Sequence, residues 1–409
     1  MHKASGQSDM GNTTDNTTSN TAKKKRENKV RKMLENPDIK RWFDNIARGS
    51  PITAESRTRR LVSFCEVRNM TPMELAQLGM KDLRAVTDLL HDHITWMEQK
   101  QYAPQYIEAT MTALKSWLRH FDVQLVRRLK ITNAESTPTL ENERVPNGTE
   151  MAELLDRAPP REGAVISLMA KSGVRPEVLG NHNGTDGLMI KDLPDLEIVN
   201  GVARFRQSPA KVIVRRTLSK ARHQYFTFLT DGGAKRVLTY LNDRAARGET
   251  LTAESAVIAP NRDYKYGRQG RDGNKFLLTV RISNIVRETF RPRFTWRPYV
   301  LRAYFDTQLL VAESRGKIAH DFRVFFMGHK GSIEAKYTTN KGILSEDLVK
   351  EMQEAFKRSE ELLDLESLGK NQMQKQKEDL QSVIANATPE VLQEMIKILT
   401  SAIKSGNNS

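Results

Sequence analysis

The chain has 409 residues, a formal net charge of +15 and a single cysteine. This length is typical of two or three domains, and an apolar fraction of 38% allows hydrophobic cores beside polar tails. Cys65 alone excludes a disulfide scaffold and a cysteine-based zinc finger. The start lacks the apolar stretch of a secretory signal, and the longest apolar run, residues 164–170, is far shorter than the ~20 residues that span a bilayer. We therefore expect a soluble, cytoplasmic protein without membrane contact.

Most of the positive charge lies in one segment. Residues 201–300 hold 21 Lys and Arg against 7 Asp and Glu, a net +14. Residues 1–35 carry +4 and residues 351–409 carry −3. A charge that serves only solubility would spread along the chain, whereas a concentrated one is typical of a surface that binds phosphates. We interpret residues 201–300 as part of a polyanion-binding surface, with an unpartnered basic surface as the alternative.

The N-terminal part divides into a tail and a helical domain. Residues 1–35 are rich in Thr, Asn, Ser and Lys, so we expect a disordered basic tail. Residues 36–131 repeat apolar residues every three or four positions, which predicts four or five short helices. Thr71-Pro72-Met73-Glu74 marks one helix start with an N-cap threonine, a proline at the first helical position and a glutamate three residues after the cap.

A second domain follows a linker. Residues 132–147 are rich in Ser, Thr, Asn and Pro and predict a linker. We assign residues 148–345 to an α+β domain that contains a buried helix around residues 164–170. Strand-like alternation then predicts a small antiparallel sheet, at residues 203–205, 211–214 and 224–229, and helices are expected at residues 233–246, 281–290 and 298–313. The fold class predicted from these patterns is mainly α with a small antiparallel β-sheet.

The C-terminal part, residues 346–409, predicts helices. A helix over residues 345–368 has Ser345 as its cap and acidic residues in its first turn, which suits the helix dipole. A last helix begins at Thr388-Pro389-Glu390 and carries an apolar stripe. That stripe either packs on the protein's own core or contacts another protomer.

Metal and nucleotide chemistry have no motif in this sequence. Among the eight histidines, only His91 and His93 form a close pair, and residues two apart do not share a helix face. No HExxH or CxxC motif is present, and neither a GxxxxGK[ST] nor a GxGxxG phosphate loop occurs. We expect no metal site and no cofactor.

Four cations and one tyrosine in the second domain stand out instead. Arg175 lies where the buried helix breaks, in Ser-Gly-Val-Arg-Pro-Glu-Val-Leu. Lys220 lies between two strand-like runs, and Arg302 lies on an otherwise apolar helix. His329 and Tyr337 follow within Met-Gly-His-Lys-Gly-Ser-Ile-Glu-Ala-Lys-Tyr. A buried arginine without an anion is costly, so Arg302 indicates a functional site or an ion pair with Asp306, four residues later.

This constellation resembles the tyrosine recombinases, the phage-integrase family of site-specific DNA recombinases. The stretches Arg-Pro-Tyr-Val-Leu-Arg and Met-Gly-His-Lys-Gly-Ser-Ile-Glu-Ala-Lys-Tyr are most similar to archaeal and archaeal-virus members. The resemblance covers roughly residues 37–345 and rests on five short motifs in the family's order. It implies a helical SAM-like core-binding domain and an α+β tyrosine-recombinase catalytic domain, which together form a clamp around DNA.

The resemblance also implies roles for the five residues. Tyr337 matches the nucleophile that forms a 3′-phosphotyrosyl link to DNA. Arg175 and Arg302 match the arginines that hold the non-bridging phosphate oxygens, a task suited to a planar, always charged fork. Lys220 matches the hairpin lysine that protonates the leaving 5′-oxygen, and His329 matches the histidine that hydrogen-bonds the phosphate. These cations act without metal or ATP.

Two positions leave alternatives open. Lys211 is also basic and lies in the same predicted sheet as Lys220. The family usually has a histidine three residues before its second arginine, and this chain has Tyr299 there. Tyr299 is able to donate a hydrogen bond to the phosphate, but a tyrosine is a poor base at pH 7, and Arg297 is a nearby cation that can supplement it.

We expect the partners to be double-stranded DNA with a specific attachment site and further copies of the chain, as a tetramer on DNA, in a nucleoid-associated location. An integrase of a mobile element is the favoured role. The alternatives are a Xer-type chromosome-dimer resolvase, a catalytically inactive DNA-binding relative and a type IB topoisomerase. The expected DNA-binding cations of the two domains are Lys115, Arg119, Arg127, Arg128, Arg215, Arg216, Arg222 and Arg297.

Overall fold

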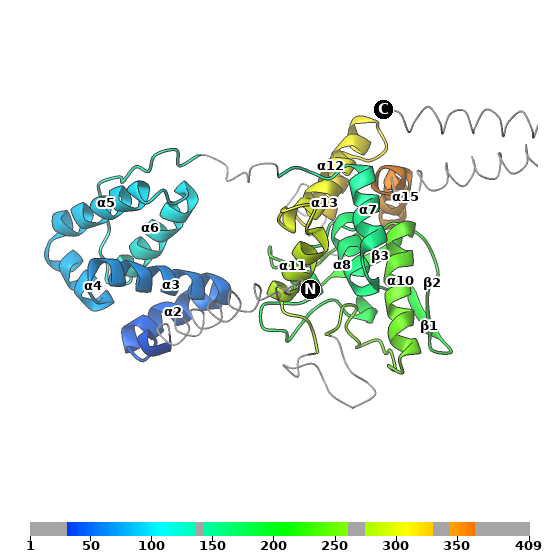
Figure 1. The fold of residues 1–409 in the computed structure, drawn as a ribbon, viewed down its shortest axis with the longest axis horizontal. Coiled ribbons are helices and arrows are strands. Elements are labelled where there is room, and N and C mark those ends of the chain that lie inside the picture. The colour runs from blue at the N-terminus through cyan, green and yellow to red at the C-terminus, as the bar shows by residue number, and fades with distance from the viewer. Residues whose placement is uncertain (1–30, 136–142, 261–274, 330–343, 365–409) are drawn as a thin grey trace, which may run out of the picture. The chain divides into compact units, whose positions relative to one another are not determined.

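The computed structural model of the chain describes residues 31–135, 143–260, 275–329 and 344–364 (Figure 1). The chain divides into two compact units, Met1–Thr139 and Leu140–Ser409. The division falls within residues 132–147, the segment predicted as a linker. None of the described helices is long and apolar enough to cross a bilayer.

The first unit is helical throughout its described elements. Trp117 is fully buried at its centre, packs edge-on against Trp42 with ring centroids 5.4 Å apart, and donates its indole N–H to the carbonyl of Pro72 at 2.8 Å. The predicted capping box is present, since Thr71 and Glu74 bond reciprocally. Cys65 is a buried thiol whose pKa burial raises to about 12. The helices are α2 (Pro37–Gly49), α3 (Pro51–Arg68), α4 (Pro72–Lys81), α5 (Leu83–Gln99) and α6 (Pro104–Arg119).

The second unit is built around one buried helix. Every residue from Gly163 to Lys171 is buried in α8, because its neighbours α7, α10, α11 and α12 cover it from several sides (Figure 1). The helix predicted around residues 164–170 is therefore confirmed. The helices of this unit are α7 (Gly148–Arg157), α8 (Pro160–Lys171), α9 (Pro176–Leu179), α10 (Asp231–Ala246), α11 (Thr279–Phe290), α12 (Tyr299–Ser314), α13 (His320–Phe326) and α15 (Glu346–Leu363).

The strands form two antiparallel pairs. β1 (Leu196–Val199) pairs with β2 (Val202–Phe205), and β3 (Ala210–Val214) pairs with β4 (Tyr225–Leu229). All residues of β4 are buried, whereas β2 has Val202 exposed at the hairpin turn. The predicted fold class, mainly α with small antiparallel pairing, is confirmed, but the single sheet that we expected is two two-stranded sheets among the described residues.

The helix expected at residues 345–368 is α15, which ends at Leu363. Its apolar side, including Met352 and Phe356, is buried in the core of the second unit, so this helix packs on its own chain. Its end is fixed by a buried ion pair, in which Lys171 Nζ lies 2.7 Å from Asp364 Oδ1. Asp364 also accepts hydrogen bonds from the Thr230 hydroxyl and the Gly232 amide at the start of α10. The last predicted helix and residues 1–30 of the predicted N-terminal tail lie outside the described residues, and residues 31–33 of that tail are helical, not disordered.

Glu360, at the same junction, is expected to make the free energy of unfolding depend on pH. Its carboxylate accepts the amide N–H of Asp231 at 2.9 Å, and burial raises its pKa from 4.5 to about 7, with Asp364 and Asp231 as further negative neighbours. A carboxyl group with a raised pKa binds more protons in the folded state than in the unfolded state. We therefore expect the free energy of unfolding to decrease as the pH rises from about 4.5 to about 7. Glu360→Gln keeps the acceptor oxygen and should flatten this slope in urea unfolding series.

Glu254→Gln is the control for this measurement: the ion pair with Lys191 lowers the pKa of Glu254, so removing this carboxylate should not flatten the slope. A slope that persists in Glu360→Gln would contradict the explanation.

Candidate active site

The side chain of Arg302 forms the centre of the candidate site. Arg302 lies in the first turn of α12 and is only 2% exposed. Its guanidinium donates to the backbone carbonyls of Gly173 and Met327. Gly173 follows α8, and Met327 follows α13. Arg302 therefore joins two loops that are far apart in the sequence.

Two glycines allow both loops to approach the core. Gly173 has φ +68° and Gly328 has φ +59°, in the left-handed region. A Cβ on Gly173 would lie 2.3 Å from the ring of Phe305, and a Cβ on Gly328 would lie 2.4 Å from the ring of Tyr225. Only glycine suits both the backbone angle and the space. Both loops are thus fixed close to Arg302. Gly173 lies two residues before Arg175, and Gly328 lies one residue before His329.

Arg175 brings a second guanidinium to this place. It directly precedes α9, is half-buried, and makes no hydrogen bond or ion pair through its side chain within the described part of the chain. Burial lowers the pKa of Arg302, and the positive charge of Arg175 lowers it further. Neither arginine is paired with a carboxylate among the residues that the structure describes. Both remain cations, because arginine does not deprotonate in proteins.

His329 completes what we call the arginine–histidine cluster, formed by Arg175, Arg302 and His329. Burial lowers the pKa of His329 below its usual 6.5, and Arg302 and Arg175 lower it further. His329 is therefore uncharged at pH 7, with one ring nitrogen as donor and the other as acceptor. Two guanidinium groups that have no carboxylate partner in the described part of the chain, together with a neutral imidazole, are suited to bind the oxygens of a tetrahedral anion such as a phosphate diester.

The alternative ion pair between Arg302 and Asp306 is wrong. Asp306 accepts a hydrogen bond from Arg323 of α13 at 2.7 Å, while Arg302 turns inward to the two carbonyls. Tyr299 is the first residue of α12, is 68% exposed, and is close enough to Arg302 to act on its pKa. Tyr299 therefore lies at the exposed edge of the cluster.

The two lysine candidates, Lys220 and Lys211, differ in how exposed their side chains are. Lys220 is exposed in the connection between β3 and β4, so its hairpin position is confirmed. Lys211 lies on β3, and its amine sits 4.2 Å from the ring centroid of Phe226. Burial lowers the pKa of Lys211, and Asp195 opposes this effect. Lys211 is thus a half-buried part of the sheet, whereas Lys220 is accessible to a ligand.

The other cations expected to bind DNA in this unit differ in their partners. Arg215 donates to both Asp186 and Asp192, and it is three-quarters buried. Arg297 forms a bidentate ion pair with Glu143. Arg216 and Arg222 are exposed, and Arg222 has φ +60° in the connection that carries Lys220. Arg215 and Arg297 thus both form ion pairs with carboxylates, and their binding to DNA stays a prediction.

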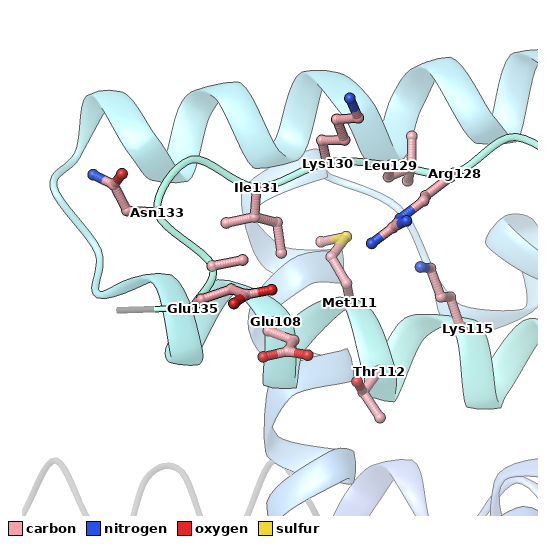
Figure 2. Close-up of a pocket in the computed structure, with 11 residues that line it drawn as sticks. Glu108, Met111, Thr112, Lys115, Arg128, Leu129, Lys130, Ile131, Asn133 and Glu135 are labelled. Atoms are coloured by element: carbon pink, nitrogen blue, oxygen red, sulfur yellow. The ribbon is translucent and has the colours of Figure 1, made fainter. Parts of the chain in front are cut away.

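In the first unit, basic side chains line two grooves. One has a volume of about 890 Å³, and Figure 2 shows Lys115 and Arg128 converging at one end of it, with Glu108 and Glu135 at the other. The second, of about 660 Å³, includes Arg119. Arg127 pairs with Asp88. These cations come from α6 and the segment that follows it, as the sequence predicts.

Tyr337 lies outside the described residues, as do residues 261–274 of the basic segment 201–300. Sequence reasoning missed a different tyrosine, Tyr225, whose hydroxyl lies beside Arg302. The only sequence signal for it is its position at the end of the connection that carries Lys220, within an otherwise apolar strand.

No family model matches the chain, and no curated protein sequence matches it. Among solved structures it is similar to XerA recombinase, with 19% identity over 78% of this chain and 97% of that one, at a TM-score of 0.31. It is also similar to the XerH site-specific recombinase bound to difH substrate, with 14% identity over 74% of this chain and 77% of that one, at a TM-score of 0.35. A third similar structure is the Tn1549 transposon integrase in complex with circular intermediate DNA, with 12% identity over 64% of this chain and 83% of that one, at a TM-score of 0.30. Similarities of this size do not establish a function.

Gly328 offers a direct test of the loop geometry. Gly328→Ala should lower the thermal unfolding midpoint, because the new Cβ meets the Tyr225 ring and the backbone has a positive φ. Gly316→Ala is the matched control, since Gly316 has φ +68° but open space around a Cβ. Both variants lose roughly 1 kcal/mol from the backbone angle, and only Gly328→Ala should lose more. Equal midpoints for the two variants would contradict the close packing of this loop on Tyr225.

Proposed function

We propose that the protein is a site-specific DNA recombinase of the tyrosine recombinase family. The observation that carries this proposal is the arginine–histidine cluster, in which Arg175, Arg302 and His329 come together and neither arginine is paired with a carboxylate among the described residues. Such a cluster needs an anion. The order of the sequence motifs that resemble the family supplies its chemical identity, a DNA phosphodiester.

In this proposal the cluster binds the scissile phosphate and stabilises the negative charge that develops on its oxygens. Tyr337 attacks the phosphorus and forms a 3′-phosphotyrosyl link, while Lys220 gives a proton to the leaving 5′-oxygen. Attack by the 5′-hydroxyl of a second strand reverses these steps. The phosphodiester energy is retained in the tyrosyl link, so the reaction needs neither ATP nor a metal. Tyr299 contributes at most a hydrogen bond from the exposed edge.

The broader role that we propose is integration or excision of a mobile element, with the two units of the chain holding duplex DNA and several copies of the chain assembled on it. Contacts to phosphates by Lys115, Arg128 and other basic side chains of the two units would make binding fall steeply with salt. A Xer-type resolvase would use the same chemistry on a chromosomal site. A type IB topoisomerase would relax supercoiled plasmid that carries no specific site, and an inactive relative would bind DNA without cleaving it.

The test is covalent trapping on nicked duplexes that carry the recognised sequence, selected from a random duplex library by binding to the protein. We expect the wild-type chain to form a covalent complex that survives denaturation, and Tyr337→Phe to form none, because the nucleophile is removed. Tyr299→Phe is the matched control, since Tyr299 lies at the exposed edge of the cluster, and it should still form the adduct. An adduct with Tyr337→Phe, or its loss only in Tyr299→Phe, would overturn the assignment.

A further inference from the structure

The phenol of Tyr225 is a buried polar group of the site whose hydrogen has no acceptor among the described residues. Tyr225 is the first residue of β4, pairs in register with Val214, and is 2% exposed. Its hydroxyl oxygen is buried and has no hydrogen-bond partner of good geometry among the described residues. Buried hydroxyl groups are nearly always hydrogen-bonded, because an unpaired one costs free energy. The missing partner therefore requires an explanation.

The surroundings of this hydroxyl define the missing partner. Burial raises the pKa of Tyr225, whereas the charges of Arg302 and Arg175 and a close approach of the Arg302 guanidinium lower it, so both guanidinium groups lie close to the phenol oxygen. The hydroxyl stays protonated at pH 7. Guanidinium groups only donate hydrogen bonds, so even where Arg302 approaches the oxygen it offers no acceptor to the phenol proton. An acceptor must come from outside this group of side chains, and an oxyanion bound by the two arginines would supply one.

The packing fixes the phenol in this place. The ring of Tyr225 lies directly under Gly328, where a Cβ would come within 2.4 Å of the ring carbon that bears the hydroxyl. The loop that carries His329 therefore covers the ring. Tyr225 also follows the connection that carries Lys220, so one hairpin holds both residues. The hydroxyl is positioned by strand pairing and by a close backbone contact, without a flexible segment.

We propose that Tyr225 is a further phosphate ligand of the active site, and that it donates its hydroxyl hydrogen to a non-bridging oxygen of the phosphate held by Arg175 and Arg302. This inference rests on the proposed function for the identity of the anion as a DNA phosphodiester. It adds a neutral donor, fixed in the core, to two cationic donors. No bond is made or broken at Tyr225, which stays protonated throughout the reaction.

The first test compares Tyr225→Phe with Tyr240→Phe. The change at Tyr225 keeps the aromatic ring under Gly328 and removes only the hydroxyl. Tyr240 is also buried in this unit, but its hydroxyl already bonds the carbonyl of Ala259 at 3.3 Å. We expect Tyr225→Phe to slow single-turnover cleavage of the nicked duplex about 100-fold, the effect of removing one oxyanion donor, with an unfolding midpoint no lower than that of the wild type. Tyr240→Phe should cleave at the wild-type rate. Wild-type cleavage by Tyr225→Phe would overturn the inference.

A second test asks which oxygen is bound. Methylphosphonate at the scissile position replaces one non-bridging oxygen by a methyl group, in two separable stereoisomers. The difference between wild type and Tyr225→Phe should vanish on one isomer and persist on the other, whereas a purely structural role would give the same ratio on both and would overturn the inference.

A third measurement does not depend on recombination. Inorganic phosphate should raise the unfolding midpoint of the wild type and of Tyr240→Phe more than that of Tyr225→Phe. If the wild-type chain forms no covalent complex but phosphate stabilises it more than Tyr225→Phe, the proposed function is wrong and the assignment of Tyr225 as an anion ligand is retained. If it cleaves DNA and the three proteins respond equally to phosphate, Tyr225 is not a ligand.

Discussion

The hydrogen bonds from the Arg302 guanidinium to two backbone carbonyls are the contacts on which the rest of the second unit's site depends. A buried guanidinium is expensive unless its donors find acceptors. Here the acceptors are the carbonyls of Gly173 and Met327, which come from loops that the sequence separates widely. Satisfying one charge therefore brings together the chain segments that carry Arg175 and His329. Because the carbonyls are dipoles and not charges, the site stays positively charged and able to bind an anion.

The helix that carries Arg302 also organises its surroundings. Within α12, Arg302 binds the two loops, Phe305 fills the space left by the absent side chain of Gly173, and the hydroxyl of Tyr304 donates to the carbonyl of Leu363 at the end of α15. The same end is held by the buried pair between Lys171 and Asp364. The end of α15 is thus in direct contact with the helix that presents the arginine. This explains why a segment downstream of the motifs belongs to the same core.

Periodicity and motif order were enough to predict much of this arrangement. The apolar pattern predicted α8 and α12 to within a few residues, and the residue types at Arg175, Arg302 and His329 predicted an anion site. The strand β1, Leu196–Val199, was missed, although its partner β2 is equally short and was predicted. The spacing left an ion pair between Arg302 and Asp306 open as the alternative, but Arg323 on another helix binds that carboxylate. Backbone carbonyls leave no mark in a residue pattern, so the actual partners of Arg302 were not predictable. The same holds for Tyr225, whose importance follows only from what surrounds it.

The central claim is that Arg175 and Arg302 are brought together to neutralise the charge of one phosphate. The most direct measurement is single-turnover cleavage by Arg175→Ala on a nicked duplex with either a normal phosphodiester or a neutral methylphosphonate at the scissile position. The account predicts a loss of about 1,000-fold or more on the charged substrate and a much smaller loss on the neutral one, which no longer needs the second cation. An equal loss on both substrates would contradict it, because Arg175 would then act through the fold and not through the charge of the phosphate.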